Sequence, residues 1–402
     1  MTEASIDRRK FIATAATTTA AVTLTRPRAA RAADEAKKIR LGLIGCGGRG
    51  KWIAKLFAAH GAYQVVAVCD YFADRAAAAA KDHDVPADRQ YTGLGGYKKL
   101  LASDIDAVAI ISPPFFHPEQ AAAAVSAGKH VYLAKPVAVD VPGCHSITAS
   151  GAAATSSNLA FRVDFQTRMD PFYLEALQRV HDGAIGDFAF GEASYHAGRL
   201  GKRGEDNTPE GRLRNWVFDK ALSGDIITEQ NIHTLDVMSW IMKAPPQRAV
   251  GGCARKVRLD AGDCSDTFSL VYEYADHVNI NFSSRQFDAY GSKPDGIRNR
   301  MFGTDGVLET MYGGLTFIRG KNFYKGGASP GIYKDGAAAN IAAFADEIHR
   351  KDFANTTVAP SVQSNLITIM GRTAAYTGKI ITWDQFVKST DRIDGRLEGL
   401  KL

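Results

Sequence analysis

The chain has 402 residues, of which 45% are hydrophobic and 23% charged, and this length suits two globular domains better than one core. It contains no run of 18 or more apolar residues that would span a bilayer as a helix. The formal net charge is +6, but the first 32 residues hold six basic and two acidic side chains, so the remainder carries about +2 and offers no electrostatic case for nucleic-acid binding.

The first 32 residues have the ordered features of an export signal. The pair Arg8-Arg9 precedes a mildly apolar, Ala- and Thr-rich stretch over residues 11–24, and Ala30 and Ala32 are small residues suited to a signal-peptidase site. This resembles a twin-arginine (Tat) signal and predicts folded export to the periplasm with cleavage after Ala32. A disordered tail is the alternative.

A strand, a glycine turn and a helix are expected next. Residues 39–44 form an apolar strand, which runs into Gly45-Cys46-Gly47-Gly48-Arg49-Gly50 and then into apolar residues at helical spacing from Trp52. Gly45 permits the sharp turn, Gly47 lets a pyrophosphate approach the backbone, and Gly50 lets the helix pack on the strand. Phosphates would lie at the helix N-terminus, with Gly48 and Arg49 beside them.

The second strand, over residues 63–69, ends at Asp70, which lies 20 residues beyond Gly50. An acid there accepts hydrogen bonds from the adenosine ribose and repels a 2′-phosphate. Arg75 follows too late to be an obvious phosphate ligand, so the pattern favours NAD over NADP. Together these elements predict a Rossmann domain over residues 38–160.

Strands and helices are expected to alternate to the end of this domain. Helices are expected over residues 73–81, 97–102 and 118–127, and strands over 107–111 and 130–133. Ser112, Pro113, His117 and Lys135 follow the last two strands. Because ligands of open α/β sheets bind at the carboxyl ends of strands, these residues are candidate cofactor contacts. His117 is expected to close the loop around the cofactor rather than to perform chemistry.

A second domain, over residues 161–395, is expected to be α+β with a mostly antiparallel open sheet. Its predicted strands cover residues 188–196, 249–257, 268–274, 278–284, 300–303 and 307–310. An arginine-rich loop spans 198–214, and helices are predicted over 225–242 and 362–377, the last packing back on the sheet.

Several motifs resemble the glucose–fructose oxidoreductase / inositol dehydrogenase (Gfo/Idh/MocA) family over about residues 38–395. They are the glycine turn, Ser112-Pro113-Pro114-x-x-His117, Lys135-Pro136, Gln166-x-Arg168-x-Asp170-Pro171, Glu229-x-x-x-His233 with Asp236, and Gly303-Thr304-Asp305-Gly306. The resemblance implies a Rossmann domain plus an open-sheet domain, a bound nicotinamide, sugar or polyol chemistry and homo-oligomers. Two departures are Ala134, where the family has Glu, and Glu229, where it often has Asp.

Glu229, His233 and Asp236 have a spacing that would place them on one face of a single helix. His233 could take the proton of a substrate hydroxyl, with Glu229 orienting its ring. By family analogy, Lys135 holds the same oxygen from the other domain and stabilises developing negative charge. The alternative is a core histidine beside solvated acids. We identify no metal-binding motif in the sequence.

Four further residues are candidate substrate contacts, namely Arg168, Tyr195, Arg199 and Trp216. Arginines can bridge sugar hydroxyls and Trp216 could stack on a sugar ring, although a polar loop or an oligomer interface would use the same residues.

The predicted export bears on how the cofactor is reoxidised. The periplasm holds no NAD pool, so a dehydrogenase that releases its cofactor after each turnover could not replace it there. We expect a retained nicotinamide that is recycled in place, in a sugar or polyol oxidoreductase. A redox-neutral NAD-dependent glycoside hydrolase or lyase is the alternative, and a non-catalytic sugar- or dinucleotide-binding protein is the second.

Overall fold

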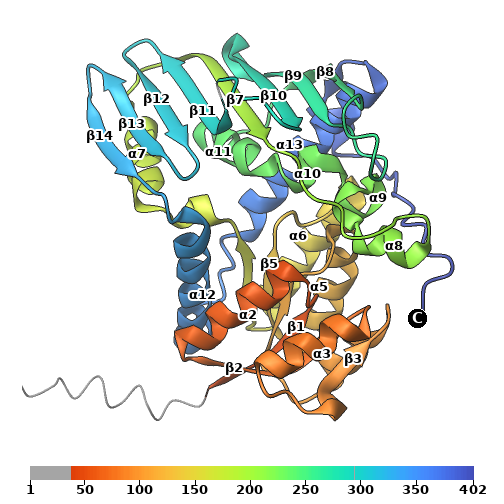
Figure 1. Cartoon of the computed structure of the whole chain (residues 1–402). Helices are drawn as coiled ribbons and strands as arrows, with labels where there is room; N and C mark the ends of the chain where they lie inside the picture. Colours follow the sequence, from red (N-terminus) through yellow and green to blue (C-terminus); the bar gives the residue numbers. More distant parts are fainter. Residues whose placement is uncertain (1–37, 294) are drawn as a thin grey trace, which may run out of the picture. The chain divides into compact units, whose positions relative to one another are not determined.

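The computed structural model describes residues 38–402 except residue 294 (Figure 1). The predicted export signal and its cleavage site lie outside the described residues. Among the helices of the described part, none is long and apolar enough to cross a membrane.

The first sheet has six strands in the order β3-β2-β1-β4-β5-β6, and its neighbouring strands run parallel. The strands are β1 (Ile39–Ile44), β2 (Tyr63–Asp70), β3 (Gln90–Thr92), β4 (Ala107–Ile110), β5 (His130–Ala134) and β6 (Phe161–Asp164). The helices that follow them are α2 (Gly48–His60), α3 (Ala73–Asp82), α4 (Gly96–Ala102), α5 (His117–Ser126) and α6 (Val141–Ser156). This is the expected Rossmann architecture, although β6 extends the sheet to Asp164, beyond the expected boundary at residue 160.

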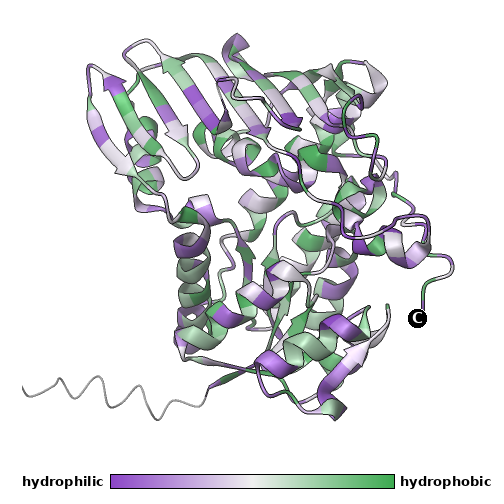
Figure 2. Cartoon of the chain, viewed as in Figure 1, coloured by the Kyte–Doolittle hydropathy of each residue, from purple (hydrophilic) through white to green (hydrophobic). Residues whose placement is uncertain are grey.

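Both faces of this sheet are buried, which is why its strands are almost continuously apolar. Leu43 on β1 packs with Ile53 and Phe57 of α2, whereas Val108 on β4 belongs to a second cluster with Leu100. Hydrophilic residues of the surrounding helices lie away from the strands (Figure 2). The alternation of apolar strand and two-sided helix therefore produces a three-layer domain.

The second sheet has nine strands in the order β14-β13-β12-β11-β7-β10-β9-β8-β15. They are β7 (Phe188–Ala197), β8 (Arg248–Ala254), β9 (Thr267–Glu273), β10 (Asn279–Gln286), β11 (Gly296–Gly303), β12 (Gly306–Met311), β13 (Leu315–Gly320), β14 (Tyr324–Ala328) and β15 (Ile381–Thr382). All neighbouring strands are antiparallel except β7 and β10. The prediction of a mostly antiparallel sheet is confirmed.

Helices cover one face of the second sheet and leave the other open (Figure 1). α7 (Pro171–His181) packs on β12–β14, α11 (Ile232–Met242) on β7 and β11, and α13 (Val358–Thr377) on β8 and β9. The C-terminal helix thus packs on the sheet as expected. α12 (Ile332–Arg350) instead returns to the first domain, where it contacts α2 and β6.

Candidate functional site

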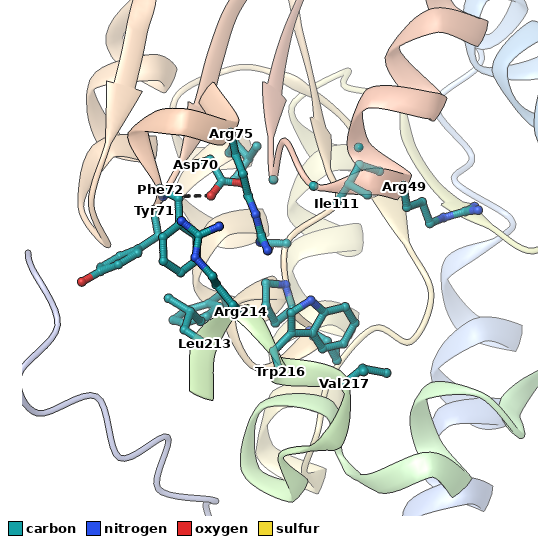
Figure 3. A pocket seen from close by; sticks show the side chains of 18 of the residues that line it. Arg49, Asp70, Tyr71, Phe72, Arg75, Ile111, Leu213, Arg214, Trp216 and Val217 are labelled. Atoms are coloured by element: carbon teal, nitrogen blue, oxygen red, sulfur yellow. Dashed lines mark hydrogen bonds between the residues drawn. The ribbon is translucent and has the colours of Figure 1, made fainter. Parts of the chain in front are cut away.

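A cavity of about 330 Å³ lies at the carboxyl ends of the first sheet's strands. One wall comes from the glycine turn, the end of β2, the loop after β4 and Lys135. The opposite wall comes from the second domain, through residues 200–201, 203, 213–218 and 229. Figure 3 shows this arrangement, with Tyr71, Phe72 and Arg75 facing Leu213, Arg214 and Trp216.

The glycine turn has the geometry that a phosphate requires. Gly45 has a φ of +90°, and a Cβ on it would lie 2.6 Å from the Ile111 carbonyl group. A Cβ on Gly50 would lie 1.7 Å from the Gly45 oxygen, so these two glycines are fixed by packing. At Gly47 the nearest atom would be 3.9 Å away, which leaves the backbone open. α2 begins there without a side-chain cap, so its N–H groups are available to an anion.

Asp70 connects this turn to the end of β2. Its carboxylate accepts hydrogen bonds from the backbone N–H of Cys46 at 2.7 Å and of Phe72 at 2.9 Å. Burial raises the pKa of Asp70, while these two hydrogen bonds oppose the rise. A carboxylate has about four acceptor positions, so it can still accept ribose hydroxyls. The turn, the helix end and Asp70 therefore fit a dinucleotide.

The other predicted cofactor residues differ in whether they are available to a ligand in the cavity. Gly48, Ser112, Pro113 and Lys135 line the cavity. Arg49 also lines it, but its guanidinium group pairs with Asp164 at 2.5 Å and points away from Asp70 (Figure 3).

His117 lies outside the lining, and its ring nitrogens are each 2.8 Å from a carbonyl oxygen, of Ser112 and of Pro136. Burial lowers the pKa of His117 to about 4. The neutral ring can donate to only one of these two carbonyl groups, but it lies between both loops, which fits the expected role in loop closure.

Lys135 joins the two domains at the inner end of the cavity. Its Nζ donates to the Glu229 carbonyl oxygen at 2.5 Å and to Glu229 Oε1 at 3.0 Å. Both side chains are largely buried, at 10% and 15% exposure. Burial raises the pKa of Tyr195, and the charge of Glu229 raises it further. Two residues 94 positions apart thus form one ionic unit.

The predicted single helix over residues 225–242 is wrong. α10 (Asp225–Glu229) and α11 are separated by a turn in which the Asn231 N–H donates to the Ile226 carbonyl, five residues back, at 2.9 Å. Such π-type turns are frequent at functional sites. The turn releases Glu229 from the α11 face, so Glu229 and His233 do not share one helical surface.

Glu229 therefore does not orient His233, contrary to expectation, because its carboxylate bonds Lys135. His233 Nδ1 has no hydrogen-bond partner among the described residues, and the ring lies 5.5 Å from that of Tyr312. Burial lowers the pKa of His233 well below its ordinary value, and the charges of Lys135 and Arg49 lower it further. His233 is thus a neutral imidazole near Lys135, although it does not line the cavity itself.

Asp236 and Arg168 pair with each other away from the cavity lining. Arg168 Nη2 donates to Asp236 Oδ1 at 2.9 Å, and Ser364 Oγ donates to the same oxygen at 2.7 Å. Asp236 is fully buried and its charge is already compensated. These contacts indicate a structural ion pair rather than the catalytic and substrate-binding positions expected for the two residues.

Of the other predicted substrate residues, Trp216 and Arg199 have different environments. Trp216 lines the cavity, whereas Arg199 forms an ion pair with Asp260 at 2.8 Å.

Sequence reasoning set Arg75 aside as a phosphate ligand and did not single out Arg203, although both residues line the cavity. It also missed Asn231, whose buried amide has no partner among the described residues. The position of Arg75 five residues after Asp70 was the only available signal, because Arg203 reaches the cavity through long-range folding.

Comparison with known proteins agrees with this architecture. The family description "Oxidoreductase family, NAD-binding Rossmann fold" matches residues 39–165, and "GFO/IDH/MocA C-terminal domain" matches residues 173–309. The two matches together cover more than half of the chain. The chain belongs to the Gfo/Idh/MocA family.

Individual relatives within the Gfo/Idh/MocA family are distant. An inositol 2-dehydrogenase of Klebsiella pneumoniae is 30% identical over 205 residues, which are 51% of this chain and 54% of that protein. A glycosyl hydrolase family 109 protein of Shewanella pealeana is 32% identical over 162 residues, or 39% of this chain and 35% of that protein. The chain therefore spans about half the length, or less, of these curated relatives.

Solved structures extend the likeness in fold. An oxidoreductase domain protein from Kribbella flavida has a TM-score of 0.71 at 19% identity, covering 86% of this chain and 99% of the other. Myo-inositol 2-dehydrogenase from Lactobacillus plantarum has a TM-score of 0.66 at 21% identity, with the same coverage. Both domains of the chain thus adopt the Gfo/Idh/MocA arrangement.

Proposed function

We propose that this protein is an oxidoreductase that acts on a hydroxyl group of a sugar or polyol with NAD as cofactor. The observation that carries the proposal is the Lys135–Glu229 pair, which closes the inner end of a cavity whose other end is an open glycine turn. A cation fixed beside a dinucleotide site can bind a substrate oxygen. The inositol 2-dehydrogenase relatives support a polyol substrate.

Each residue has a defined task in this proposal. The glycine turn and Asp70 would hold the dinucleotide, which would supply the acceptor for the hydride of the substrate C–H bond. Lys135 holds the substrate oxygen and stabilises its developing negative charge. In this proposal His233, whose ring is neutral, takes the hydroxyl proton as it leaves the substrate. Glu229 holds the Lys135 ammonium group in place.

We also propose that the protein is exported by the twin-arginine route and works in the periplasm with a retained cofactor. The ordered signal features of residues 8–32 support this part of the proposal. A retained nicotinamide would be reoxidised by a second carbonyl substrate at the same site.

A redox-neutral glycoside hydrolase is the second candidate, and the Shewanella pealeana relative is the observation that favours it. In that reaction the hydride returns to the substrate after elimination of a glycosidic substituent. A non-catalytic binding protein is the third, although the buried Lys135–Glu229 pair would then have no chemical task.

Product analysis separates these functions. The purified protein is incubated with inositols and aldoses, singly and in pairs, and with aryl glycosides. We expect matched amounts of an oxidised and a reduced product from a productive pair, and Lys135→Met should abolish both. A released aglycone without net oxidation would establish the second candidate, and no conversion of any compound would favour a binding protein.

A further inference from the structure

Two arginines from different domains approach the glycine turn. Arg75 lies on α3, and its Nη1 is 3.9 Å from the position that a Cβ on Gly47 would occupy. Arg203 lies in the second domain, and its Nη2 is 3.8 Å from the corresponding position at Gly48. Both arginines line the cavity, so two cations lie over the part of the backbone that is open.

These arginines differ from their neighbours in having no acidic partner at ion-pair distance in the described part of the chain. Arg49, Arg212 and Arg214 form ion pairs with Asp164, Asp219 and Asp74, respectively. Neither Arg75 nor Arg203 forms an ion pair with any of the described residues. Burial lowers the pKa of Arg75. The charge of Asp70 opposes this fall, whereas the charges of Arg214 and Arg203 add to it. Like charges held together beside a cavity indicate an anionic ligand.

The fold holds the backbone of Arg203 in place, although its side chain is exposed. Its N–H donates to Asn215 Oδ1 at 2.6 Å. Asn215 is 3% exposed, and its Nδ2 donates to the carbonyl groups of Gly204 at 3.1 Å and Gly211 at 3.0 Å. The C-terminal segment secures the same loop, because Arg212 Nη2 donates to the Gly395 carbonyl at 2.6 Å.

We propose that Arg75 and Arg203 clamp the pyrophosphate of the bound dinucleotide from the side opposite the N-terminus of α2. This inference rests on the cofactor site of the proposed function. Since Arg203 belongs to the second domain, the nucleotide is enclosed between the domains and its release requires this contact to break. The two side chains approach Gly47 and Gly48 of the turn, which favours the pyrophosphate over an adenosine 2′-phosphate as their ligand.

Calorimetric titration of the nucleotide-free protein tests the clamp. ADP-ribose carries the pyrophosphate and adenosine does not. Arg75→Gln and Arg203→Gln should each weaken ADP-ribose binding about 10- to 100-fold, the scale of a lost charged hydrogen bond, and should leave adenosine binding unchanged. Arg203→Gln should also speed NAD dissociation by a similar factor. Lys202→Gln is the matched control, because Lys202 lies in the same loop but pairs with Glu205 and Asp206.

Three results would overturn the clamp. They are unchanged ADP-ribose binding in both variants, equal losses for ADP-ribose and adenosine, and a loss confined to NADP. Arg203→Lys, which keeps the charge, should retain most of the affinity even if the Gln variant unfolds. Failure of wild-type protein to bind ADP-ribose at all would instead refute the cofactor site itself, whereas normal binding without turnover would refute only the proposed reaction.

Discussion

At the scale of single residues, the proposed chemistry depends on which carboxylate pairs with Lys135. Ala134 cannot supply one, and Glu229 reaches across from the second domain to do so. The lysine motif and the acid-to-histidine spacing identified Lys135, Glu229 and His233 from the sequence. Their contacts could not be predicted, because the turn between α10 and α11 decides which partner Glu229 faces.

Replacing either Lys135 or His233 should lower turnover and leave cofactor binding intact. Lys135→Met and His233→Ala should each lower turnover about 10²- to 10⁴-fold, the range for a lost charge stabiliser or general base. Both variants should retain nucleotide, since neither residue belongs to the glycine turn. The double variant should be little worse than either single one. Additive losses would show that the residues do not act on one substrate oxygen.

The lowered pKa of His233 predicts a pH-dependent stability. The unfolded chain binds a proton at this residue near pH 6.5 while the folded protein does not, so folding stability falls as the pH drops below that value. The slope for one proton is about 1.4 kcal/mol per pH unit. In urea titrations, the free energy of unfolding of His233→Asn should fall less steeply toward acidic pH than that of wild type, because the variant lacks this contribution. Parallel curves would contradict the assignment.

Asp70 should set the choice of dinucleotide. Asp70→Asn removes the negative charge and should weaken NAD binding while reducing discrimination against NADP, by about 1–3 kcal/mol in total. Asparagine can keep one of the two backbone hydrogen bonds, which limits the loss of folding stability. Competition titrations with NAD and NADP measure the change, and unaltered relative affinity would contradict the role.

At the scale of elements, the apolar runs of β1, β2, β4 and β5 were predictable because each is buried on both faces. β14 and β15 were not, since β14 contains two glycines and β15 has two residues. α12 also escaped prediction, although it connects the second sheet to α2. The second-domain wall of the cavity depends on long-range contacts that no local pattern encodes.

The Arg168–Asp236 pair stabilises the contact between the region after β6 and α11. Arg168→Ala should cost about 3–5 kcal/mol of folding stability, because it leaves a buried carboxylate without its cation. Arg168→Met combined with Asp236→Leu should cost less than the single change. Denaturant unfolding measures both, and a single variant as stable as wild type would show that the pair is not needed.

At the scale of the whole molecule, the proposed export distinguishes the proposed chemistry of this chain from that of a freely exchanging dehydrogenase. Replacing Arg8 and Arg9 with Lys should leave the protein in the cytoplasm, because the twin-arginine route requires the arginine pair. Cell fractionation and N-terminal sequencing of the mature protein measure this. Unchanged periplasmic recovery, or a mature terminus far from Ala33, would contradict the export proposal.

The most direct test of the central claim is the redox state of nicotinamide bound to the purified protein. Wild-type protein loaded with NAD is mixed anaerobically with inositols or aldoses, and the absorbance of reduced nicotinamide is followed in a single turnover. We predict that a substrate produces this band in wild type, that a carbonyl sugar then removes it, and that Lys135→Met shows neither change while binding NAD normally. The same band in Lys135→Met at the wild-type rate would contradict the claim that the Lys135 site performs the chemistry.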